Sequence, residues 1–496
     1  RVRSSAASDV YKRQLMNIVT LIEELVNGLI AAEDIFFQNP KDFYSLEKSV
    51  KSTTEAFSAA FLGNVLTSMN EKIYEDRWRK TRYTAQRTDK RMLISSVGDI
   101  TFESTYFRSK ADGVHHYLLE EILGLDTRER FTEEAEVVLL TEAMKTSYSE
   151  ATKVLPSRQE ISKTTVMNKV HGIADEIWIP EREEKKVCKY LFIEADEDHV
   201  AEQHGRWYPP EDNSSFISKL AYVYEYKQEN PKCKARKELV NTFYFGGVYS
   251  GTNGTEKFWN KVGEFIHKTY NEEELKRIFI SGDGASWIKS GAKYLNKALF
   301  CADKFHLMKY INAAAGQMLD ESELVKSEIY RMLYRRDKQG IKEYTDRMMA
   351  SASNQKPIQD LQTFVLGNWS AVMRTYHSKV ITGCSAESHV SHVLSDRLSS
   401  RPMGWSKTGA DRMSKLRCYE KNYGREKIID LVKYSRQQRK LARTGTDSVE
   451  PIRVSLREIR ADHYNQARSY IERIQATIPD GTVRKIAAIR EQIRLI

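Results

Sequence analysis

The chain has 496 residues, of which 29% are charged, and a formal net charge of +10. This length allows about three domains with substantial hydrophobic cores, and the absence of any run approaching eighteen apolar residues excludes a transmembrane helix. Five scattered cysteines without a CxxC pair argue against a disulfide framework and a cysteine-built zinc site. We therefore expect a multidomain cytoplasmic protein with no membrane partner, whose basic charge points towards a polyanion.

The first 91 residues divide into a leader and a helical region. Residues 1–15 show no apolar periodicity and precede Met16, so we interpret them as an extraneous leader and leave them out of the fold. Region 16–91 has apolar residues at helical spacing, and it ends in a basic run that contains Trp78 and Tyr83. Basic and aromatic residues together are typical of contacts to phosphates and bases, although a solvated basic helix is the alternative. The residues of this run that we expect to bind DNA are Arg77, Arg79, Lys80 and Arg82.

Region 92–180 combines a β-hairpin with two short helices. Period-two alternation around Gly98 predicts the hairpin and its turn. Helices are expected over Tyr148–Leu155 and Lys163–Ile173, because Pro156 interrupts the pattern and Ser162 can cap the second helix. This outline is typical of a helix-turn-helix, although two core helices joined by a turn are the alternative. The polar residues that would face a DNA groove are Lys163, Thr164, Thr165, Asn168 and Lys169.

An α/β texture begins after a charged linker that ends at Lys186. Three strands in succession suggest an antiparallel meander, and two further strands alternate with helices. We expect these strands at Val187–Asp196, Phe216–Tyr226, Leu239–Tyr249, Arg277–Ser281 and Ala298–Ala302. The predicted fold is therefore α+β, with a catalytic core over 187–304 and 381–425.

Three helical segments complete the chain. Residues 305–380 read as a helical insertion within the core. Ser385 can cap a following helix that carries Glu387 in its first turn. Residues 426–496 read as a basic helical tail, and neither an internal repeat nor a low-complexity tract is apparent.

Acidic residues cluster where the first core strand ends. Glu194, Asp196 and Asp198 follow or end an apolar run, where an unpaired carboxylate costs several kcal/mol, roughly. A divalent metal held by oxygen ligands would offset this cost, and a solvated acidic turn is the alternative. Asp196 directly ends the apolar run, which makes it the preferred first ligand; Asp198 is the reserve and Glu194 a distant third.

The order of elements suggests where the other acids belong. Three strands, helix, strand, helix, strand and an acid-bearing helix is the succession of the ribonuclease H-like fold. The acids at its three characteristic positions are Asp196, Asp283 and Glu387. Such carboxylates hold two metal ions about 3.5–4 Å apart for an in-line phosphoryl displacement. Asp283 lies between two glycines that let the backbone turn beside a phosphate, although an ordinary capping turn has the same pattern.

The motifs IEADEDHV, ISGDGASWI and ADKFHLMKYI, with the Glu387 segment and RPMGW, resemble those of the ISLre-type insertion-sequence transposases of bacteria. These enzymes are relatives of the Mutator-like DDE transposases. The resemblance runs from Met16 to about Lys440, and it implies a DDE transposase with an N-terminal DNA-binding part and a helical insertion. It also implies auxiliary roles for Asp303, His306 and Lys309. His306 would orient a DNA phosphate or a water, with packing under the insertion as the alternative.

We therefore expect an enzyme that binds the inverted ends of its element, cleaves them and joins them to target DNA. Two Mg²⁺ or Mn²⁺ ions per active site and a homodimer or larger assembly on double-stranded DNA are implied, in a bacterial cytoplasm beside the nucleoid. The alternatives are a helix-turn-helix protein without catalysis, a decayed transposase, or a ribonuclease H-like nuclease without strand transfer.

Overall fold

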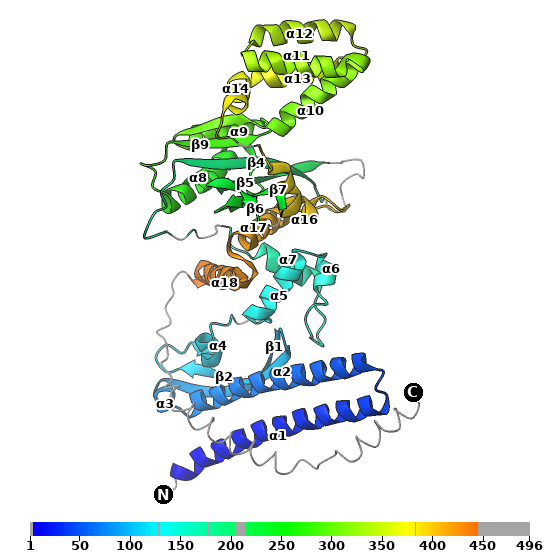
Figure 1. Ribbon diagram of the computed structural model, residues 1–496. Helices are drawn as coiled ribbons and strands as arrows, with labels where there is room; N and C mark the ends of the chain where they lie inside the picture. Colours follow the sequence, from blue (N-terminus) through cyan, green and yellow to red (C-terminus); the bar gives the residue numbers. More distant parts are fainter. Residues whose placement is uncertain are drawn as a thin grey trace. The chain divides into compact units, whose positions relative to one another are not determined.

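The computed structural model describes residues 3–126, 129–175, 179, 181–203, 214–231, 233–381 and 383–444. The chain divides into two compact units, whose elements are labelled in Figure 1. The first consists of residues 1–143, 147–166 and 432–496, and the second of residues 144–146 and 167–431. Among the described residues, no helix combines the length and the apolar character needed to cross a bilayer.

Two long helices, α1 (Arg3–Gln38) and α2 (Phe43–Glu75), open the first unit. Asp42 caps α2, because its Oδ1 accepts a hydrogen bond from the Ser45 backbone N at 3.0 Å. Helix α1 includes residues 3–15, for which the sequence predicted no element. That segment contains neither proline nor glycine, so nothing in it interrupts a helix that the following residues favour.

The expected hairpin is present, and it is longer than predicted. After the short helix α3 (Arg77–Arg82), β1 (Tyr83–Ser95) pairs antiparallel with β2 (Gly98–Ser109) along its whole length. The turn closes at Gly98, whose φ of 127° suits glycine. The basic run is therefore helical only up to Arg82 and continues as a strand, so the alternative of a solvated basic helix is wrong beyond that residue.

Helix α2 packs on this hairpin. A Cβ on Gly63 would lie 2.3 Å from the Thr101 carbonyl oxygen, so only glycine permits this approach. Asn70 of α2 donates to Thr105 Oγ1 at 3.0 Å and accepts from the Thr105 N at 2.9 Å. The apolar residues buried between helix and hairpin are Ile73, Leu93, Ile100, Phe102, Phe107, Leu118 and Leu119.

The hairpin is followed by one short strand and several helices, and a helix from later in the chain joins the first unit. They are β3 (His115–His116), α4 (Leu118–Ile122), α5 (Glu133–Ala143), α6 (Tyr148–Ala151), α7 (Lys163–His171) and α18 (Ile428–Thr444). The two helices of the predicted helix-turn-helix are thus present, but α6 ends four residues earlier than expected. Ser162 begins α7 as predicted, since its Oγ accepts from the Thr165 N at 3.1 Å. Arg436 of α18 forms an ion pair with Glu136 of α5, with 2.7 Å between Arg436 Nη2 and Glu136 Oε2.

A five-stranded sheet forms the centre of the second unit. Its strands are β4 (Tyr190–Ala201), β5 (Ser215–Tyr224), β8 (Phe243–Gly247), β9 (Arg277–Gly282) and β10 (Ala298–Ala302), and their spatial order is β10-β9-β4-β5-β8. The pairs β4–β5 and β5–β8 are antiparallel, whereas β4–β9 and β9–β10 are parallel. The predicted meander and the two later strands are therefore present.

One prediction about this sheet is wrong in detail. The segments expected as single strands, Phe216–Tyr226 and Leu239–Tyr249, each contribute to two strands. The extra strands β6 (Tyr226–Asn230) and β7 (Cys233–Val240) pair only with each other, as a two-stranded ribbon. Polar residues dominate β6, so hydrophobic alternation gave no signal for it, and the left-handed Asn241 separates β7 from β8.

Helices cover both faces of the sheet. Helices α8 (Gly251–Thr269) and α9 (Ser286–Tyr294) pack on the face that presents Leu191, Ile193 and Ala195 of β4. Helix α17 (Lys407–Tyr423) covers the opposite face, where Ser414 and Ser218 of β5 are hydrogen-bonded at 2.9 Å. Alternate residues of β4 therefore face either α8 and α9 or the opposite side of the sheet, which α17 covers.

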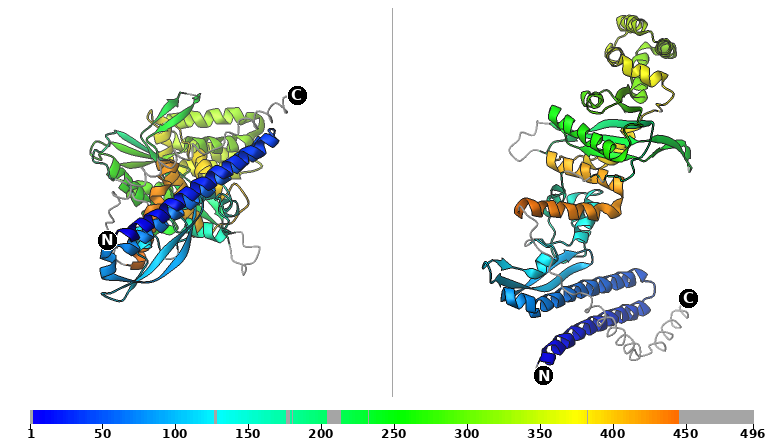
Figure 2. Two further views of the ribbon diagram at one scale, coloured as in Figure 1. Left: turned by 90° about the horizontal axis from the view of Figure 1, so that it is seen from below. Right: turned by 90° about the vertical axis from the view of Figure 1, so that its left-hand side faces the viewer.

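The predicted helical insertion lies between β10 and the last part of the core. It contains α10 (Lys304–Ala315), a 3₁₀ turn (Gly316–Glu321), α11 (Ser322–Arg335), α12 (Lys338–Ser351), α13 (Lys356–Gly367) and α14 (Trp369–His377). Helices α11, α12 and α13 stand away from the sheet (Figure 2). Helix α14 returns to the sheet, where Thr375 Oγ1 donates to the Ala302 carbonyl at 2.7 Å.

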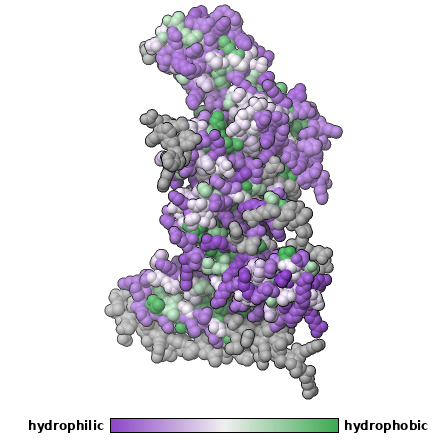
Figure 3. Space-filling view, turned by 180° about the vertical axis from the view of Figure 1, so that it is seen from behind, coloured by the Kyte–Doolittle hydropathy of each residue, from purple (hydrophilic) through white to green (hydrophobic). Residues whose placement is uncertain are grey.

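The surface gives little indication of a large apolar site. On the face drawn in Figure 3, the described residues are mostly hydrophilic, and hydrophobic residues are scattered among them. This face therefore shows no large apolar patch among the described residues.

Candidate functional site

The parallel strands β4, β9 and β10 bring three aspartates to one edge of the sheet. Glu194 pairs with Ser281 in the register of β4 and β9, so two places further on Asp196 is level with Asp283. Gly282 pairs with Ala302, which makes Asp283 level with Asp303. Carboxyl ends of parallel strands share an edge, and three acids from distant parts of the sequence therefore meet there.

Asp196 and Asp283 repel each other. Burial and the nearby negative charge of Asp283 raise the pKa of Asp196 to about 6, although a hydrogen bond from the Glu197 N at 2.9 Å favours the ionised form. The positive charge of His306 also favours the ionised form, but burial outweighs it. Two partly buried carboxylates in this state suit a divalent cation, which would lower the cost of keeping both ionised.

The loop that carries Asp283 is tightly constrained. A Cβ on Gly282 would lie 2.7 Å from the Ala195 carbonyl oxygen, and Gly284 has a φ of 99°. Asp283 Oδ1 accepts a hydrogen bond from the Ala285 N at 2.8 Å. Both glycines are therefore required by the backbone, one for close approach and one for its conformation.

A second contact fastens this loop to β4. Trp287 Nε1 donates to Glu197 Oε2 at 2.5 Å, and the Trp287 ring is buried. Lys219 of β5 pairs with Glu197 across the strands, and its buried ammonium donates to Thr255 Oγ1 at 2.8 Å. These contacts lie on the face of β4 opposite to Asp196 and hold the Asp283 loop from behind.

Asp303 and His306 form a dyad beside the pair. Asp303 caps α10 through a hydrogen bond from the Phe305 N at 3.0 Å, and its other oxygen lies 2.8 Å from His306 Nδ1. This hydrogen bond raises the pKa of His306 despite partial burial, and the charges of Asp303, Asp283 and Asp196 act in the same direction. A cationic imidazole facing the two aspartates could bind a phosphate oxygen. Lys309, the third auxiliary residue expected here, is exposed on the same helix.

Glu387 lies on α15 (Ala386–Val390), in its first turn as the sequence predicted, and its side chain is exposed. Within the described residues, no hydrogen bond or ion pair joins Glu387 to Asp196 or Asp283. Among all the residues that the structure describes, no three His, Cys, Asp or Glu side chains converge closely enough to hold a metal ion. The strand register therefore brings Asp196 and Asp283 to one level of the sheet, and the role of Glu387 as a third ligand stays a prediction.

The two other acids of the strand have different surroundings. Glu194 is 1% exposed and accepts hydrogen bonds from Tyr222, Tyr224 and Ser385. Asp198 is 7% exposed and accepts hydrogen bonds from Ser395 and Ser399. Protein donors occupy both oxygens of Glu194 but only Oδ1 of Asp198, whose Oδ2 is buried and has no hydrogen-bond partner among the described residues. Asp198 therefore stays the reserve candidate for the first metal ligand, whereas Glu194 is fully engaged by the protein. Sequence reasoning missed these partners, because tyrosine and serine carry no charge signal.

The basic residues predicted to bind DNA in the first unit do not all face solvent. Arg77, Lys80 and Arg82 are exposed, and the Arg82 guanidinium lies 4.5 Å from the centre of the Trp78 ring. Arg79 is only 6% exposed and donates to the Ile73 carbonyl at 3.4 Å. Arg79 is thus a structural residue, a distinction that a run of basic residues cannot reveal.

The predicted recognition helix α7 exposes part of its polar set. Lys163, Thr164 and Asn168 are exposed, whereas Thr165 and Lys169 are half-buried. Val166 and Val170 on the same helix are fully buried. The helix therefore has one buried face and one polar face. Both a DNA-recognition helix and an ordinary core helix would have these two faces.

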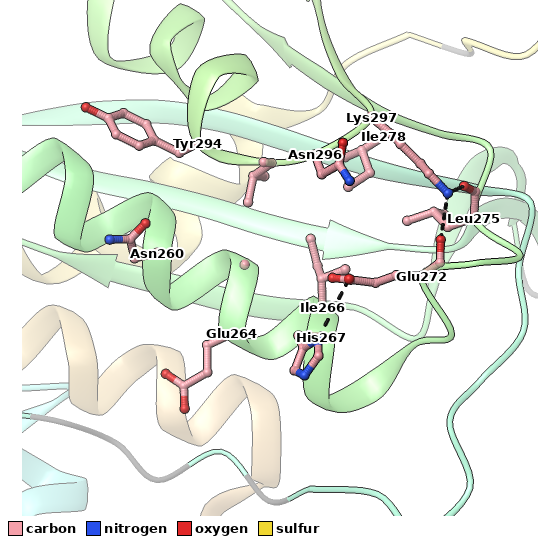
Figure 4. Close-up of a pocket in the computed structure, with 12 residues that line it drawn as sticks. Asn260, Glu264, Ile266, His267, Glu272, Leu275, Ile278, Tyr294, Asn296 and Lys297 are labelled. Atoms are coloured by element: carbon pink, nitrogen blue, oxygen red, sulfur yellow. Dashed lines mark hydrogen bonds and ion pairs between the residues drawn. The ribbon is translucent and has the colours of Figure 1, made fainter.

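A pocket of about 460 Å³ lies away from the acids (Figure 4). It is lined by residues of α8, the start of β9 and the loop before β10, including Ile266, Leu275, Ile278 and Lys297. Lys297 donates to the Glu272 and Leu275 carbonyls at 2.7 Å. Ile278 lies near the start of β9, whereas Asp283 follows its end, so the pocket lies at the opposite edge of the sheet and does not belong to the acid site.

Comparison with known proteins gives one family match. The model of "Uncharacterised protein family (UPF0236)" matches residues 37–435. A UPF0236 protein of Caldanaerobacter subterraneus subsp. tengcongensis, which carries eleven locus tags, is 33% identical over 414 residues and covers 83% of this chain and 84% of its own length. UPF0236 protein TTE0402 of the same organism is 31% identical over 426 residues, covering 85% of this chain and 81% of its own length.

The chain also matches solved structures, among them the Drosophila P element transposase strand transfer complex. The sequence identity is 12%, and the match covers 64% of this chain and 93% of the other. The TM-score is 0.19, and a likeness this low carries no argument about fold or function.

Proposed function

This chain belongs to the uncharacterised protein family UPF0236, and we propose that it is a DDE transposase of a bacterial insertion sequence. It would bind the ends of its element, cleave the terminal phosphodiester bonds and transfer the freed 3′ ends to target DNA. The observation that carries the proposal is the meeting of Asp196 and Asp283, from two parallel strands, in a partly buried pair in which burial and the charge of Asp283 raise the pKa of Asp196.

The sheet topology supports the same proposal. Three antiparallel strands followed by two parallel strands, in the order β10-β9-β4-β5-β8, are what the ribonuclease H-like fold would give. An acid on the first strand, one after the fourth and a helix with Glu387 after the fifth correspond to the set that the sequence resemblance implies. We propose that the second unit is a ribonuclease H-like core.

The relatives offer a separate line of support. A protein that carries eleven locus tags in one genome is present there in many copies. Multiple near-identical copies are what an element that inserts new copies of itself leaves behind. We therefore propose the same mobility for the element that encodes this chain, acting on DNA in the cytoplasm.

In the proposed reaction, Asp196, Asp283 and Glu387 would hold two Mg²⁺ or Mn²⁺ ions. Bound divalent ions supply activation of the attacking oxygen and stabilisation of the leaving oxygen in such a site. Because the Glu387 side chain is exposed, we propose that it turns towards the aspartates when DNA and metal bind. His306 is held by a hydrogen bond with Asp303, which raises its pKa, and would contact the phosphate as a cation.

DNA binding is proposed for the exposed basic residues Arg77, Lys80 and Arg82, together with the exposed polar residues of α7. Cations that contact phosphates release counterions, so binding should weaken steeply with salt. Pairing of two element ends requires at least two protomers, and we propose a homodimer or larger assembly on DNA.

The test is an assay with labelled element-end DNA, a target plasmid and Mg²⁺ or Mn²⁺. The proposal predicts cut ends and joined products from the wild type and neither from Asp283→Ala. Equal cleavage by Asp283→Ala would show that the reaction centre is elsewhere. Cleavage without any joined product would identify a nuclease, and DNA binding without cleavage would identify a DNA-binding protein or a decayed transposase.

A further inference from the structure

Three acids of β4 lie on one face of the strand, and among the described residues the outer two accept hydrogen bonds from side chains far away in the sequence, whereas Asp196 accepts one from the Glu197 N. Glu194, Asp196 and Asp198 are two residues apart, a spacing that puts them on the same side. Their neighbours on β5 are Tyr222, Leu220 and Ser218, respectively. Asp196 thus lies between two carboxylates that, unlike Asp196 itself, accept hydrogen bonds from distant serines.

Glu194 is a hub of five contacts. Its Oε1 accepts from Tyr224 Oη at 2.6 Å and from Lys227 Nζ at 2.7 Å. Its Oε2 accepts from Tyr222 Oη at 2.5 Å and from Ser385, through the backbone N at 2.6 Å and Oγ at 2.9 Å. A carboxylate has about four acceptor positions, so Glu194 is saturated.

The Ser385 contact is informative because Ser385 precedes α15. Its side chain forms no capping hydrogen bond with its own helix. Instead its hydroxyl and backbone N–H both point to Glu194, so the strand supplies an acceptor at the helix start. Lys227 adds a donation to the Gly383 carbonyl at 3.0 Å. The start of α15 is therefore fixed to β4 by two hydrogen bonds to Glu194, and Lys227 of β6 adds a third hydrogen bond just before the helix.

Asp198 holds the other end of the same segment. Its Oδ1 accepts from Ser395 Oγ at 3.0 Å and from Ser399 Oγ at 2.7 Å. Ser395 ends a π-helical turn (Ser391–Ser395), and Ser399 follows α16 (Asp396–Leu398). The segment from Ser385 to Ser399 is therefore attached to β4 at both ends.

The lengths of strand and segment agree. Four residues of β4 separate Glu194 from Asp198, about 13 Å at the usual rise of a strand. Ten helical residues separate Ser385 from Ser395, about 15 Å at the usual rise of a helix. The segment that carries Glu387 therefore lies along β4, with Asp196 between its two attachments. A π-helical turn inside it changes the helical register by one residue.

We propose that Glu194 and Asp198 are positioning residues that clamp the Glu387-bearing segment on either side of Asp196. This inference rests on the proposed function, because it gives the clamp the task of presenting Glu387 to the reaction centre. The clamp fixes both ends of the segment, so that only the exposed side chain of Glu387 has to adjust when DNA binds. The flanking acids thus act through α15 and contact no substrate.

The test removes serine hydroxyls and leaves the charges in place. Ser385→Ala with Ser395→Ala and Ser399→Ala detaches the hydroxyl contacts at both ends, whereas Ser388→Ala changes an exposed serine of the same helix and is the matched control. The triple variant should cleave element-end DNA roughly 10- to 100-fold more slowly at saturating DNA, with an unchanged KM for DNA. A triple Ser→Thr variant, which retains the hydroxyls, should recover most of the rate.

A measurement independent of catalysis separates this inference from the proposed function. Amide hydrogen exchange over residues 386–398 of the full chain should be faster in the triple Ala variant and unchanged in Ser388→Ala. If the wild type cleaves and the triple Ala variant cleaves equally fast, the positioning role is wrong and the proposed function stands. If the wild type cuts no DNA, the proposed function fails; unchanged exchange in the triple variant would then overturn the clamp as well.

Discussion

Glu194 and Asp196 lie two residues apart on one face of one strand, and their surroundings are opposite. Burial alone would raise the pKa of Glu194, but Lys227 and the two tyrosines outweigh burial and hold this pKa below its usual range. Asp196 lacks such donors, and burial beside Asp283 raises its pKa to about 6. A carboxylate saturated by protein donors stabilises the fold, whereas one left next to a like charge is available for a ligand.

The largest expected effect concerns the unsatisfied carboxylate. Asp196→Asn should slow strand cleavage by at least about a thousandfold, because a neutral amide is a poor ligand for a divalent ion. The same change should leave the free energy of unfolding equal or slightly higher, since it removes repulsion from Asp283. Single-turnover cleavage and urea denaturation measure the two quantities. A large loss of stability would mean that Asp196 is a structural residue like Glu194.

Glu194→Ala should have the opposite profile. Removing one partner from a buried ion pair costs about 3–5 kcal/mol, so the free energy of unfolding should fall by about that amount. The matched variant is Lys227→Met combined with Glu194→Gln, which removes both charges and should cost less than Glu194→Ala. Urea denaturation of the wild type and the two variants tests this order. Equal stability of the wild type and Glu194→Ala would show that the contacts of Glu194 do not stabilise the fold.

The first unit offers the same contrast between arginines. Arg79→Ala should lower the free energy of unfolding by about 1–3 kcal/mol, because Arg79 is buried and hydrogen-bonded. Arg77→Ala should leave stability unchanged but reduce the dependence of DNA affinity on salt by about one counterion. Binding titrations at several salt concentrations and thermal unfolding check both variants. If Arg77→Ala lost stability and Arg79→Ala changed only the salt dependence of DNA affinity, burial would not distinguish structural from DNA-binding arginines in this helix.

The smallest effect is expected at a satisfied but exposed carboxylate. Partial burial would raise the pKa of Asp175, but Lys415 and Arg412 outweigh it and hold the pKa well below its usual range. A lowered folded pKa gives stability that is present above the unfolded pKa of about 4 and is lost as pH falls towards the folded value.

Because the Asp175 side chain is 63% exposed, solvent screening should keep this contribution below about 1 kcal/mol. Asp175→Asn should therefore flatten the loss of stability between pH 4 and about pH 2 only slightly. Acid unfolding of both proteins measures the difference. A steeper loss in the variant would contradict the sign of the pKa shift.

The sequence predicted much of the core because its signals were local. Apolar alternation located the strands β4, β9 and β10, and glycines on both sides of Asp283 indicated the constrained turn. Strand order then brought Asp196 and Asp283 to one edge. The ribbon of β6 and β7 could not be predicted in this way, because polar strands paired only with each other have no hydrophobic pattern.

Long-range polar contacts account for the rest. Nothing local distinguishes Glu194 from Asp196, since the difference arises from donors elsewhere in the chain: Tyr222, Tyr224, Lys227 and Ser385, the last of which lies 191 residues away. Arg79 and Arg77 differ only in which side of a short helix they occupy. Glu387 was predicted on its helix correctly, but a spacing of 104 residues from Asp283 contains no information on how closely the two side chains approach.

The central claim is that Asp196 and Asp283 form a metal-dependent reaction centre. Electron paramagnetic resonance titration of Mn²⁺ into the full chain bound to element-end DNA tests it most directly. We predict that the wild type retains Mn²⁺ that Asp196→Asn and Asp283→Ala lose, whereas Ser388→Ala binds as the wild type does. Equal Mn²⁺ binding by all four proteins would contradict the assignment.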